Sequence, residues 1–135
     1  MTAVVADTHA VIWYILDQDS LSSSALRAFD TASQTGKPIY LSAISIVEIH
    51  YLVEKDKLNK SFVERLNAAL ALPDGALVAL PVTVEIAHAV TQIPRITIPE
   101  MPDRIIAATA LHLRLPLVTR DAAFSRVPGL RVLAY

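Results

Sequence analysis

Four acidic residues in this sequence occupy positions from which they could bind a metal ion together: Asp7, Glu48, Asp103 and Asp121. Asp7 follows the apolar run Ala3–Ala6, and Asp121 comes just after Leu117–Thr119, so both stand at the exit of a predicted strand. In open α/β sheets, ligands bind at this carboxyl edge of the strands. Carboxylates gathered there, in a chain without cysteine, indicate a site for a hard divalent cation.

Of the four acids, Glu48 is the one whose position is least explained by a structural role. If the segment around it is helical, Ile44, Val47, Tyr51 and Leu52 share a stripe with the glutamate at three- and four-residue spacing. The stripe predicts a carboxylate on a core-facing surface. Ionised carboxylates are almost never fully buried unless they are paired or bound to metal. The alternative is a structural ion pair with an arginine or lysine at the end of the stripe.

The other three acids each have a structural explanation. Asp7 and Asp103 stand at the starts of predicted helices, where aspartate is a preferred N-cap, and Asp121 suits a turn. Their convergence in one topology favours the functional interpretation. Two like charges at ~4 Å repel by about 4 kcal/mol at an effective dielectric near 20, so a cluster needs a cation or protonation.

The elements that position these acids follow from five short apolar runs, whose continuous hydrophobicity predicts strands covered on both faces. The predicted strands are Ala3–Ala6, Ile39–Leu41, Leu77–Leu80, Leu117–Thr119 and Leu130–Leu133. The intervening segments predict helices near 9–16, 21–34, 43–55, 61–71, 83–92 and 103–115, with Ser20, Ser42 and Thr83 as caps. This alternation predicts right-handed crossovers and a parallel sheet. The segment Pro94–Pro102 contains three prolines and is expected to form a rim or lid over the site.

The composition sets the class of protein. A chain of 135 residues is one domain long, so we expect residues 1–135 to form a single domain. Although 53% of residues are hydrophobic, the longest apolar run, Ala10–Leu16, is too short to span a membrane. The start of the chain lacks the pattern of a signal peptide, and the absence of cysteine fits a reducing compartment, so we expect a cytoplasmic protein.

The net charge of −1 gives no general electrostatic argument for nucleic-acid binding. Any such contact must come from local groups. Arg104 and Arg120 adjoin two of the acids and are candidates for holding phosphates, with surface salt bridges as the alternative. The four histidines show no pair at the spacing of a zinc site.

Four motifs together resemble the PIN-domain ribonucleases, and specifically the VapC-type toxins of type II toxin–antitoxin systems. The resemblance spans essentially the whole chain, and its motifs are Asp7-Thr8-His9-Ala10, Ser45-Ile46-Val47-Glu48, Pro102-Asp103-Arg104-Ile105-Ile106-Ala107-Ala108 and Val118-Thr119-Arg120-Asp121-Ala122-Ala123-Phe124. It implies a three-layer α/β/α fold with a central five-stranded, mostly parallel sheet. It also implies an endoribonuclease that uses Mg²⁺ or Mn²⁺, forms a homodimer and is covered by a cognate antitoxin.

Carried over by position, Asp7, Glu48 and Asp103 match the family's three strongest metal-binding acids, and Asp121 matches the more variable fourth. Thr119 matches a hydroxyl residue often found two positions before the fourth acid. The sequence departs from the pattern after Asp121: alanines 122 and 123 stand where many members carry a further acidic or polar residue. This departure leaves fewer ligands for a second metal ion and so argues against a second metal position.

Three other classes of protein are alternatives. A response-regulator receiver would need an acidic pair after the first strand and an aspartate after a central strand, but Ser42 and Pro81 follow the central candidates. A haloacid dehalogenase-type phosphatase would need a second acid two residues after Asp7, where His9 stands. The third alternative is a catalytically silent, receiver-like or PIN-like domain that binds Mg²⁺ or a basic partner segment.

Overall fold

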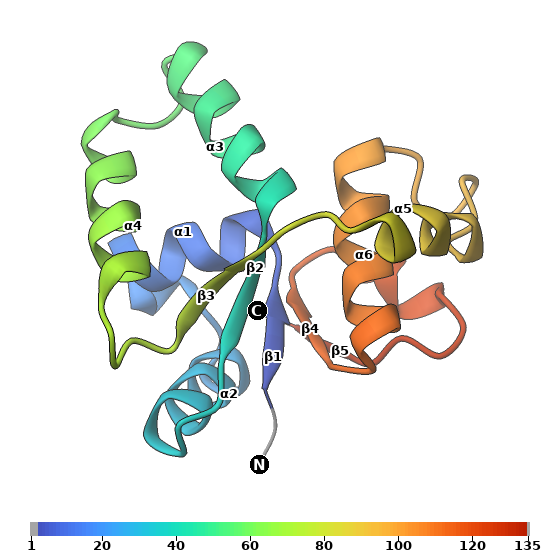
Figure 1. Ribbon diagram of the computed structural model, residues 1–135, viewed down its shortest axis with the longest axis horizontal. Helices are drawn as coiled ribbons and strands as arrows, with labels where there is room; N and C mark the ends of the chain where they lie inside the picture. The colour runs from blue at the N-terminus through green and yellow to red at the C-terminus, as the bar shows by residue number, and fades with distance from the viewer. Residues whose placement is uncertain (1–2, 135) are drawn as a thin grey trace.

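The computed structural model describes residues 3–134 of the chain and contains a five-stranded parallel sheet (Figure 1). The strands are β1 (Val4–Ala6), β2 (Ile39–Ser42), β3 (Leu77–Leu80), β4 (Leu117–Thr119) and β5 (Val132–Ala134). Their spatial order is β3-β2-β1-β4-β5, and every pairing is parallel. The predicted α/β class and parallel sheet are therefore confirmed.

Six α-helices connect the strands and cover both faces of the sheet, which makes the three layers of the predicted fold. They are α1 (Thr8–Leu16), α2 (Ser23–Gln34), α3 (Ala43–Glu54), α4 (Ser61–Ala71), α5 (Val84–Ala89) and α6 (Met101–Leu113). Helices α1, α2 and α4 lie on one side of the sheet, and α5 and α6 lie on the other (Figure 1). None of the helices between residues 3 and 134 has both the length and the apolar character needed to cross a membrane.

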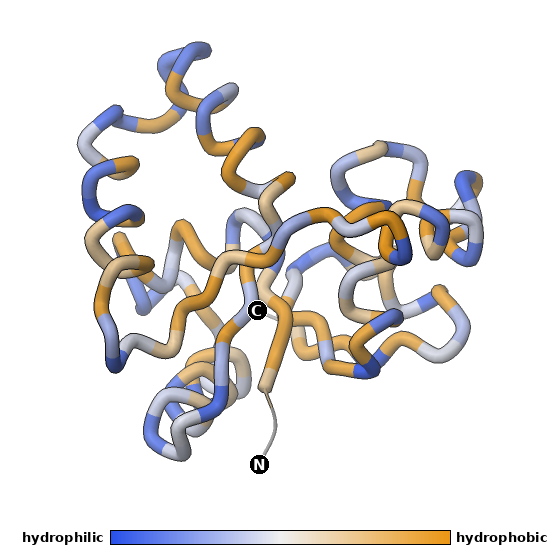
Figure 2. Tube along the Cα trace, in the orientation of Figure 1, coloured by the Kyte–Doolittle hydropathy of each residue, from blue (hydrophilic) through white to orange (hydrophobic). Residues whose placement is uncertain are grey.

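The core consists of two apolar clusters separated by the sheet. Along β1 the side chains alternate between them: Val4 and Ala6 belong to the cluster under α1, α2 and α4, whereas Val5 belongs to the cluster under α5 and α6. A strand buried on both faces must be apolar throughout, which explains the continuous hydrophobic runs in the sequence. Figure 2 shows that the strands consist mainly of hydrophobic residues, whereas α2 contains a mixture of hydrophobic and hydrophilic residues.

The boundaries differ from the prediction at several places, including the start of α2, the end of α5 and the start of β5. Helix α2 is capped by Ser22, whose hydroxyl accepts a hydrogen bond from the Ala25 N–H, and not by Ser20. The predicted helix 83–92 is α5 followed by a short 3-10 turn over Val90–Gln92. The last strand starts two residues later than predicted. The predicted caps Ser42 and Thr83 are confirmed, because their hydroxyls accept from the N–H groups of Ile44 and Ile86.

Candidate metal centre

The sheet topology brings the first and fourth acids to one place. Strand β1 lies at the centre of the sheet, between β2 and β4. The chain first adds β2 and β3 on one side of β1 and then crosses to add β4 and β5 on the other side. The carboxyl ends of β1 and β4 therefore flank the point where the strand order reverses, the usual ligand site of such sheets. Asp7 follows β1, and Asp121 follows β4 at the start of a 3-10 helix (Ala122–Arg126).

A hollow of about 400 Å³ opens at this point and contains all four predicted acids. Its lining comprises Asp7, Thr8, His9, Trp13, Glu48, Glu100, Asp103, Arg120, Asp121 and Phe124. These residues come from α1, α3, α6 and the segment after β4, which are far apart in the sequence. The structure thus places the four acids along one cavity, as the sequence pattern predicts.

Asp7 is held by hydrogen bonds to both of its carboxylate oxygens. As expected for an N-cap, Oδ1 accepts the Ala10 N–H at 2.9 Å. Oδ2 accepts the Thr119 hydroxyl at 2.5 Å, and the Thr119 oxygen in turn accepts the Asp121 N–H at 3.2 Å. Thr119 therefore fixes the relative positions of the first and fourth acids.

Asp121 is the most exposed of the four acids, because it lies in the turn that leaves the sheet. Its Oδ1 accepts the Ala123 N–H at 2.9 Å and starts the 3-10 helix, which confirms the turn role considered for it. Oδ2 is available to the hollow. A structural role and a place in the cavity are therefore compatible for this residue.

Glu48 is half-buried and reaches the hollow from α3. The Thr8 hydroxyl lies 2.6 Å from Glu48 Oε1 and 2.8 Å from Ser45 Oγ. A hydroxyl has one proton and an ionised carboxylate only accepts, so Thr8 donates to Glu48 and the Ser45 hydroxyl donates to Thr8. Because Thr8 and Ser45 are buried, this chain of hydrogen bonds fixes the Glu48 carboxylate from the interior side.

The predicted core-facing stripe around Glu48 is wrong in part. Val47 is 48% exposed and Tyr51 is 60% exposed, whereas Ser45 and Ile49 are the buried residues of α3. Glu48 therefore lies at the edge of the buried face and not within it. Helix α3 is apolar on nearly all sides, so residue spacing alone does not show which side is packed.

Asp103 shows the clearest electrostatic perturbation in the hollow. Its pKa is raised from 3.8 to about 6, first by burial and then by the negative charges of Glu48, Glu100, Asp7 and Asp121. The expected N-cap role is wrong, since α6 begins earlier: Glu100 is the N-cap residue and Asp103 lies in the first turn. Helix capping therefore does not account for Asp103, and a nearby cation would stabilise its ionised form.

Five residues of the hollow were not identified as site candidates from the sequence: Thr8, His9, Trp13, Glu100 and Phe124. Glu100 adds a fifth carboxylate and belongs to the predicted rim segment, which is anchored by the buried Ile98. A sequence signal existed for it, because Glu100 and Asp103 are three residues apart at a helix start.

The two arginines beside the acids have different surroundings. Arg120 lines the hollow and donates to the Ser20 carbonyl at 3.2 Å. Arg104 instead donates to the carbonyls of Val90 and Ile93 at 2.9–3.2 Å, which ties α6 to the end of the α5 segment. Arg120 is therefore the arginine of the hollow, and the Arg104 guanidinium has a structural position.

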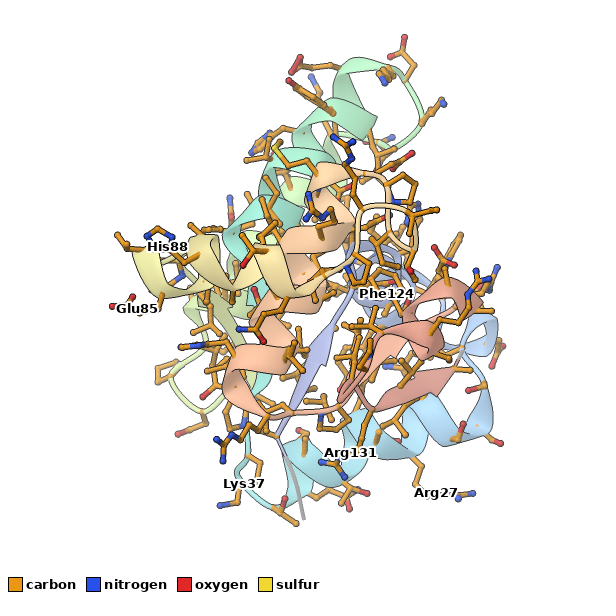
Figure 3. The ribbon with its side chains drawn as sticks, turned by 90° about the vertical axis from the view of Figure 1, so that its right-hand side faces the viewer. Arg27, Lys37, Glu85, His88, Phe124 and Arg131 are labelled. Carbon is orange, nitrogen blue, oxygen red and sulfur yellow. The ribbon has the colours of Figure 1, made fainter. Side chains whose placement is uncertain are left out.

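Several other ionisable side chains point away from the hollow or lie at the opposite edge of the sheet. Figure 3 shows Glu85 and His88 projecting outward from α5, whereas Phe124 is directed into the interior. Lys37 and Arg131 precede β2 and β5, so they lie at the opposite, amino-terminal edge of the sheet (Figure 3). The acids and these cations thus occupy opposite ends of the strands.

The donor set fits a hydrated, hard cation. Carboxylate oxygens and hydroxyls line the cavity, and the raised pKa of Asp103 reflects first its burial and then the negative charges of the neighbouring acids. Within residues 3–134, no group of three or more His, Cys, Asp or Glu side chains is arranged to enclose a metal ion. Mg²⁺ typically retains several waters and takes only one or two carboxylates directly, so this spacing suits it better than a zinc site.

The sequence matches the PIN domain family over residues 4–130. That range includes all four predicted acids and every strand except β5. The chain therefore belongs to the PIN domain family, whose members are metal-dependent nucleases. The resemblance inferred from the four motifs is confirmed at the level of the family.

Individual proteins agree with this assignment. The chain is 26% identical over 121 residues to Ribonuclease VapC22 of Mycobacterium tuberculosis, covering 90% of this chain and 88% of that protein. VapBC2 from Rickettsia felis, solved with a DNA fragment from its promoter, has the same fold with a TM-score of 0.74 at 18% identity, and 98% of each chain is covered. DNA-bound VapBC from Salmonella typhimurium gives 0.70 at 21% identity, covering 99% of this chain and 98% of that one.

Proposed function

We propose that this protein is a divalent-metal-dependent endoribonuclease that hydrolyses RNA phosphodiester bonds, and that it is the toxin of a toxin–antitoxin pair. Residues 1–135 act as a single nuclease domain in the cytoplasm. The observation that carries the proposal is the convergence of Asp7, Glu48, Asp103 and Asp121 on one hollow in a PIN-family chain. The 26% identical relative is itself a ribonuclease.

Asp7, Glu48, Asp103 and Asp121 hold the metal, which is Mg²⁺, with Mn²⁺ as a substitute. Asp7 and Asp103 are the direct ligands, whereas Glu48 and Asp121 act through water. Such an ion would lower the pKa of a bound water and stabilise negative charge on the reacting phosphate. Alanines 122 and 123 add no further ligand after Asp121, which favours one tightly held ion over two.

Glu48 is the residue best placed to receive a proton. Its Oε1 accepts the Thr8 hydroxyl, which leaves Oε2 as the oxygen that accepts a proton from the attacking water. The buried pair Thr8 and Ser45 keeps the carboxylate in one orientation. Arg120, at the exposed side of the same hollow, binds a flanking phosphate of the RNA.

The protein forms a homodimer. Exposed apolar side chains support this proposal: Val47 and Tyr51 on α3, and Val82 and Val84 before and within α5. Apolar patches of this kind on a soluble domain mark surfaces that are covered by another protein. In a two-fold dimer the same surface of each protomer forms the interface, so α3 and α5 of one protomer would face the same helices of its partner.

A cognate antitoxin covers the acidic hollow. The structural neighbours include a toxin–antitoxin complex from Klebsiella pneumoniae and VapBC-5 from Mycobacterium tuberculosis, which supports the same kind of partner here. The five carboxylates of the hollow favour a partner segment that carries arginine or lysine. Copurification of a small protein with a basic tail, when both are expressed from the native locus, tests this part.

The nuclease activity is tested with a pool of single-stranded RNA. We expect cleavage with Mg²⁺, none with EDTA, and none by Asp7→Asn, which retains an N-cap residue for α1 and should fold normally. Asp74→Asn, in an exposed turn outside the hollow, is the matched control and should cleave like the wild type. Metal-dependent cleavage that survives Asp7→Asn would overturn the proposal, and absence of cleavage by the wild type would favour a silent interaction domain.

A further inference from the structure

Trp13 is the one aromatic side chain of the hollow that is neither buried nor part of the acidic cluster. It is the single tryptophan of the sequence, it lies on α1, and it is half-buried. Phe124, the other aromatic residue of the lining, is 1% exposed and belongs to the core. His9 precedes Trp13 by four residues, so both share one face of α1 toward the cavity.

The indole is supported from behind and open in front. Trp13 packs against the apolar cluster under α1, α2 and α4, and it also lines the cavity. Among residues 3–134, no side chain or carbonyl accepts a hydrogen bond from its indole N–H. A large ring held by a packed core loses little conformational freedom when a ligand binds to its open face.

The electrostatics of the hollow make an uncharged contact necessary for RNA. Five carboxylates line the cavity, and Arg120 is the single arginine or lysine of its lining. A bound divalent ion offsets part of this negative charge, but phosphate contacts alone would hold RNA weakly. Stacking of a base on an aromatic ring does not depend on the net charge of the site.

We propose that Trp13 is the base-stacking platform of this nuclease: an unpaired RNA base beside the scissile phosphate lies flat on its indole. The inference rests on the proposed function and names the substrate as single-stranded RNA, whose bases can splay out onto aromatic side chains. Trp13 is six residues after Asp7, the N-cap of α1, and this separation is about 9 Å along the helix axis. That span places the stacked base next to the phosphate held at the acids, and not upon it.

The single tryptophan makes the contact directly measurable, because all indole fluorescence comes from Trp13. The probes are a short oligouridylate and a ribose-phosphate oligomer of the same length without bases. Binding is recorded with Ca²⁺ in place of Mg²⁺, a larger ion with looser geometry, to separate binding from cleavage. We expect the oligouridylate to quench Trp13 and the base-free oligomer to bind about 5- to 150-fold more weakly, the range of one stacked base.

Variants separate stacking from packing. Trp13→Leu should raise KM for oligouridylate cleavage in Mg²⁺ without a matching fall in kcat, and should remove the preference for the oligomer with bases. Trp13→Phe keeps a ring and should retain most of that preference. Leu16→Ala, which removes an exposed apolar side chain from the same helix outside the hollow, should leave both unchanged.

The outcomes distinguish this inference from the proposed function. If the wild type cleaves RNA but its fluorescence does not respond to oligouridylate and Trp13→Leu keeps the wild-type KM, the stacking role is overturned and the nuclease stands. If an arginine-rich peptide quenches Trp13 and RNA does not, the indole serves a partner protein and the inference is wrong. If the wild type cleaves no RNA, both proposals fall.

Discussion

At the scale of single residues, Asp103 carries the strongest sign that a cation belongs in the hollow. Its carboxyl lies among four other acids and has a pKa of about 6 in the absence of a metal. The structure supplies no cap hydrogen bond that would make the residue useful to its helix. A residue that repels its surroundings when ionised is costly to the fold, so its role must lie elsewhere.

The burial of Asp103 and the repulsion from its acidic neighbours together predict how stability depends on pH. The pKa of Asp103 is about 6 in the folded protein and 3.8 without the fold, so the folded state binds more protons between these values. The contribution of this carboxyl group to the stability of the metal-free protein is therefore largest at low pH and is lost as the pH rises through about 6. In EDTA at neutral pH, Asp103→Asn should raise Tm by about 2–5 °C, a modest gain because the group is half-exposed.

Thermal unfolding in EDTA at neutral pH and near pH 4 measures this effect. The gain from Asp103→Asn should shrink at the lower pH, where the wild-type carboxyl is protonated as well. Added Mg²⁺ should reverse the order of the two proteins at neutral pH, because the wild type binds the ion more tightly. A lower Tm of the variant in EDTA at neutral pH would show that the carboxylate is structural.

Removal of the Thr8 hydroxyl should lower the activity without unfolding the protein. Thr8→Val keeps the shape of the buried side chain but removes the hydrogen bond to Glu48, so kcat should fall about 10- to 100-fold, as for other groups that orient metal-site acids. Thr8→Ser restores the hydroxyl and should recover most activity. Thr109→Val removes a buried hydroxyl from α6, outside the hollow, and serves as the control. Equal activity of Thr8→Val and wild type would remove Thr8 from the mechanism.

At the scale of elements, α3 is anchored to the core by its buried apolar residue Ile49, and this anchor helps to position Glu48. Ile49 is fully buried against the α1, α2 and α4 cluster, whereas Val47, two residues before it, is 48% exposed. Ile49→Ala should therefore lower the free energy of unfolding by about 2–5 kcal/mol, and Val47→Ala by less than about 1 kcal/mol. Denaturant unfolding of the monomeric protein at low concentration measures both. Equal losses from the two variants would contradict the assignment of Ile49 as the main anchor of α3.

Much of this architecture could be predicted from the sequence because the strands are covered on both faces. Such strands are short apolar runs, and the acids directly after two of them had to meet at one edge of a parallel sheet. The orientation of α3 could not be predicted, since its apolar residues surround the axis and packing selects the buried side. The position of Trp13 in the hollow could not be predicted either. In an apolar helix a tryptophan is expected to be a core residue, and only the structure shows the cavity beside it.

At the scale of the whole molecule, charges are separated along the strands. Carboxylates gather at the carboxyl edge, whereas Lys37 and Arg131 lie at the amino edge (Figure 3). A net charge of −1 conceals this polarity. In the proposed function, the metal, the RNA and a basic partner segment would all bind at this carboxyl edge of the sheet.

The proposed homodimer places Tyr51 in an interface. Tyr51→Glu puts a charge into an apolar contact and should convert the dimer to a monomer. Leu72→Glu is the matched control, because Leu72 is 61% exposed after α4, and the wild-type Tyr51 is 60% exposed. Sedimentation velocity gives the mass of each form. A monomeric wild type, or dissociation by Leu72→Glu and not by Tyr51→Glu, would contradict the interface.

The proposed activity requires that a divalent ion held by the acids of the hollow brings about RNA cleavage. The most direct test compares two titrations of the same protein with Mn²⁺ at neutral pH: ion binding by electron paramagnetic resonance, and cleavage of single-stranded RNA. The midpoints of binding and activation should coincide in the wild type, and Asp103→Asn should shift both to higher Mn²⁺ by about tenfold or more. Cleavage activated with no bound ion, or Mn²⁺ binding unchanged by Asp103→Asn, would contradict the account.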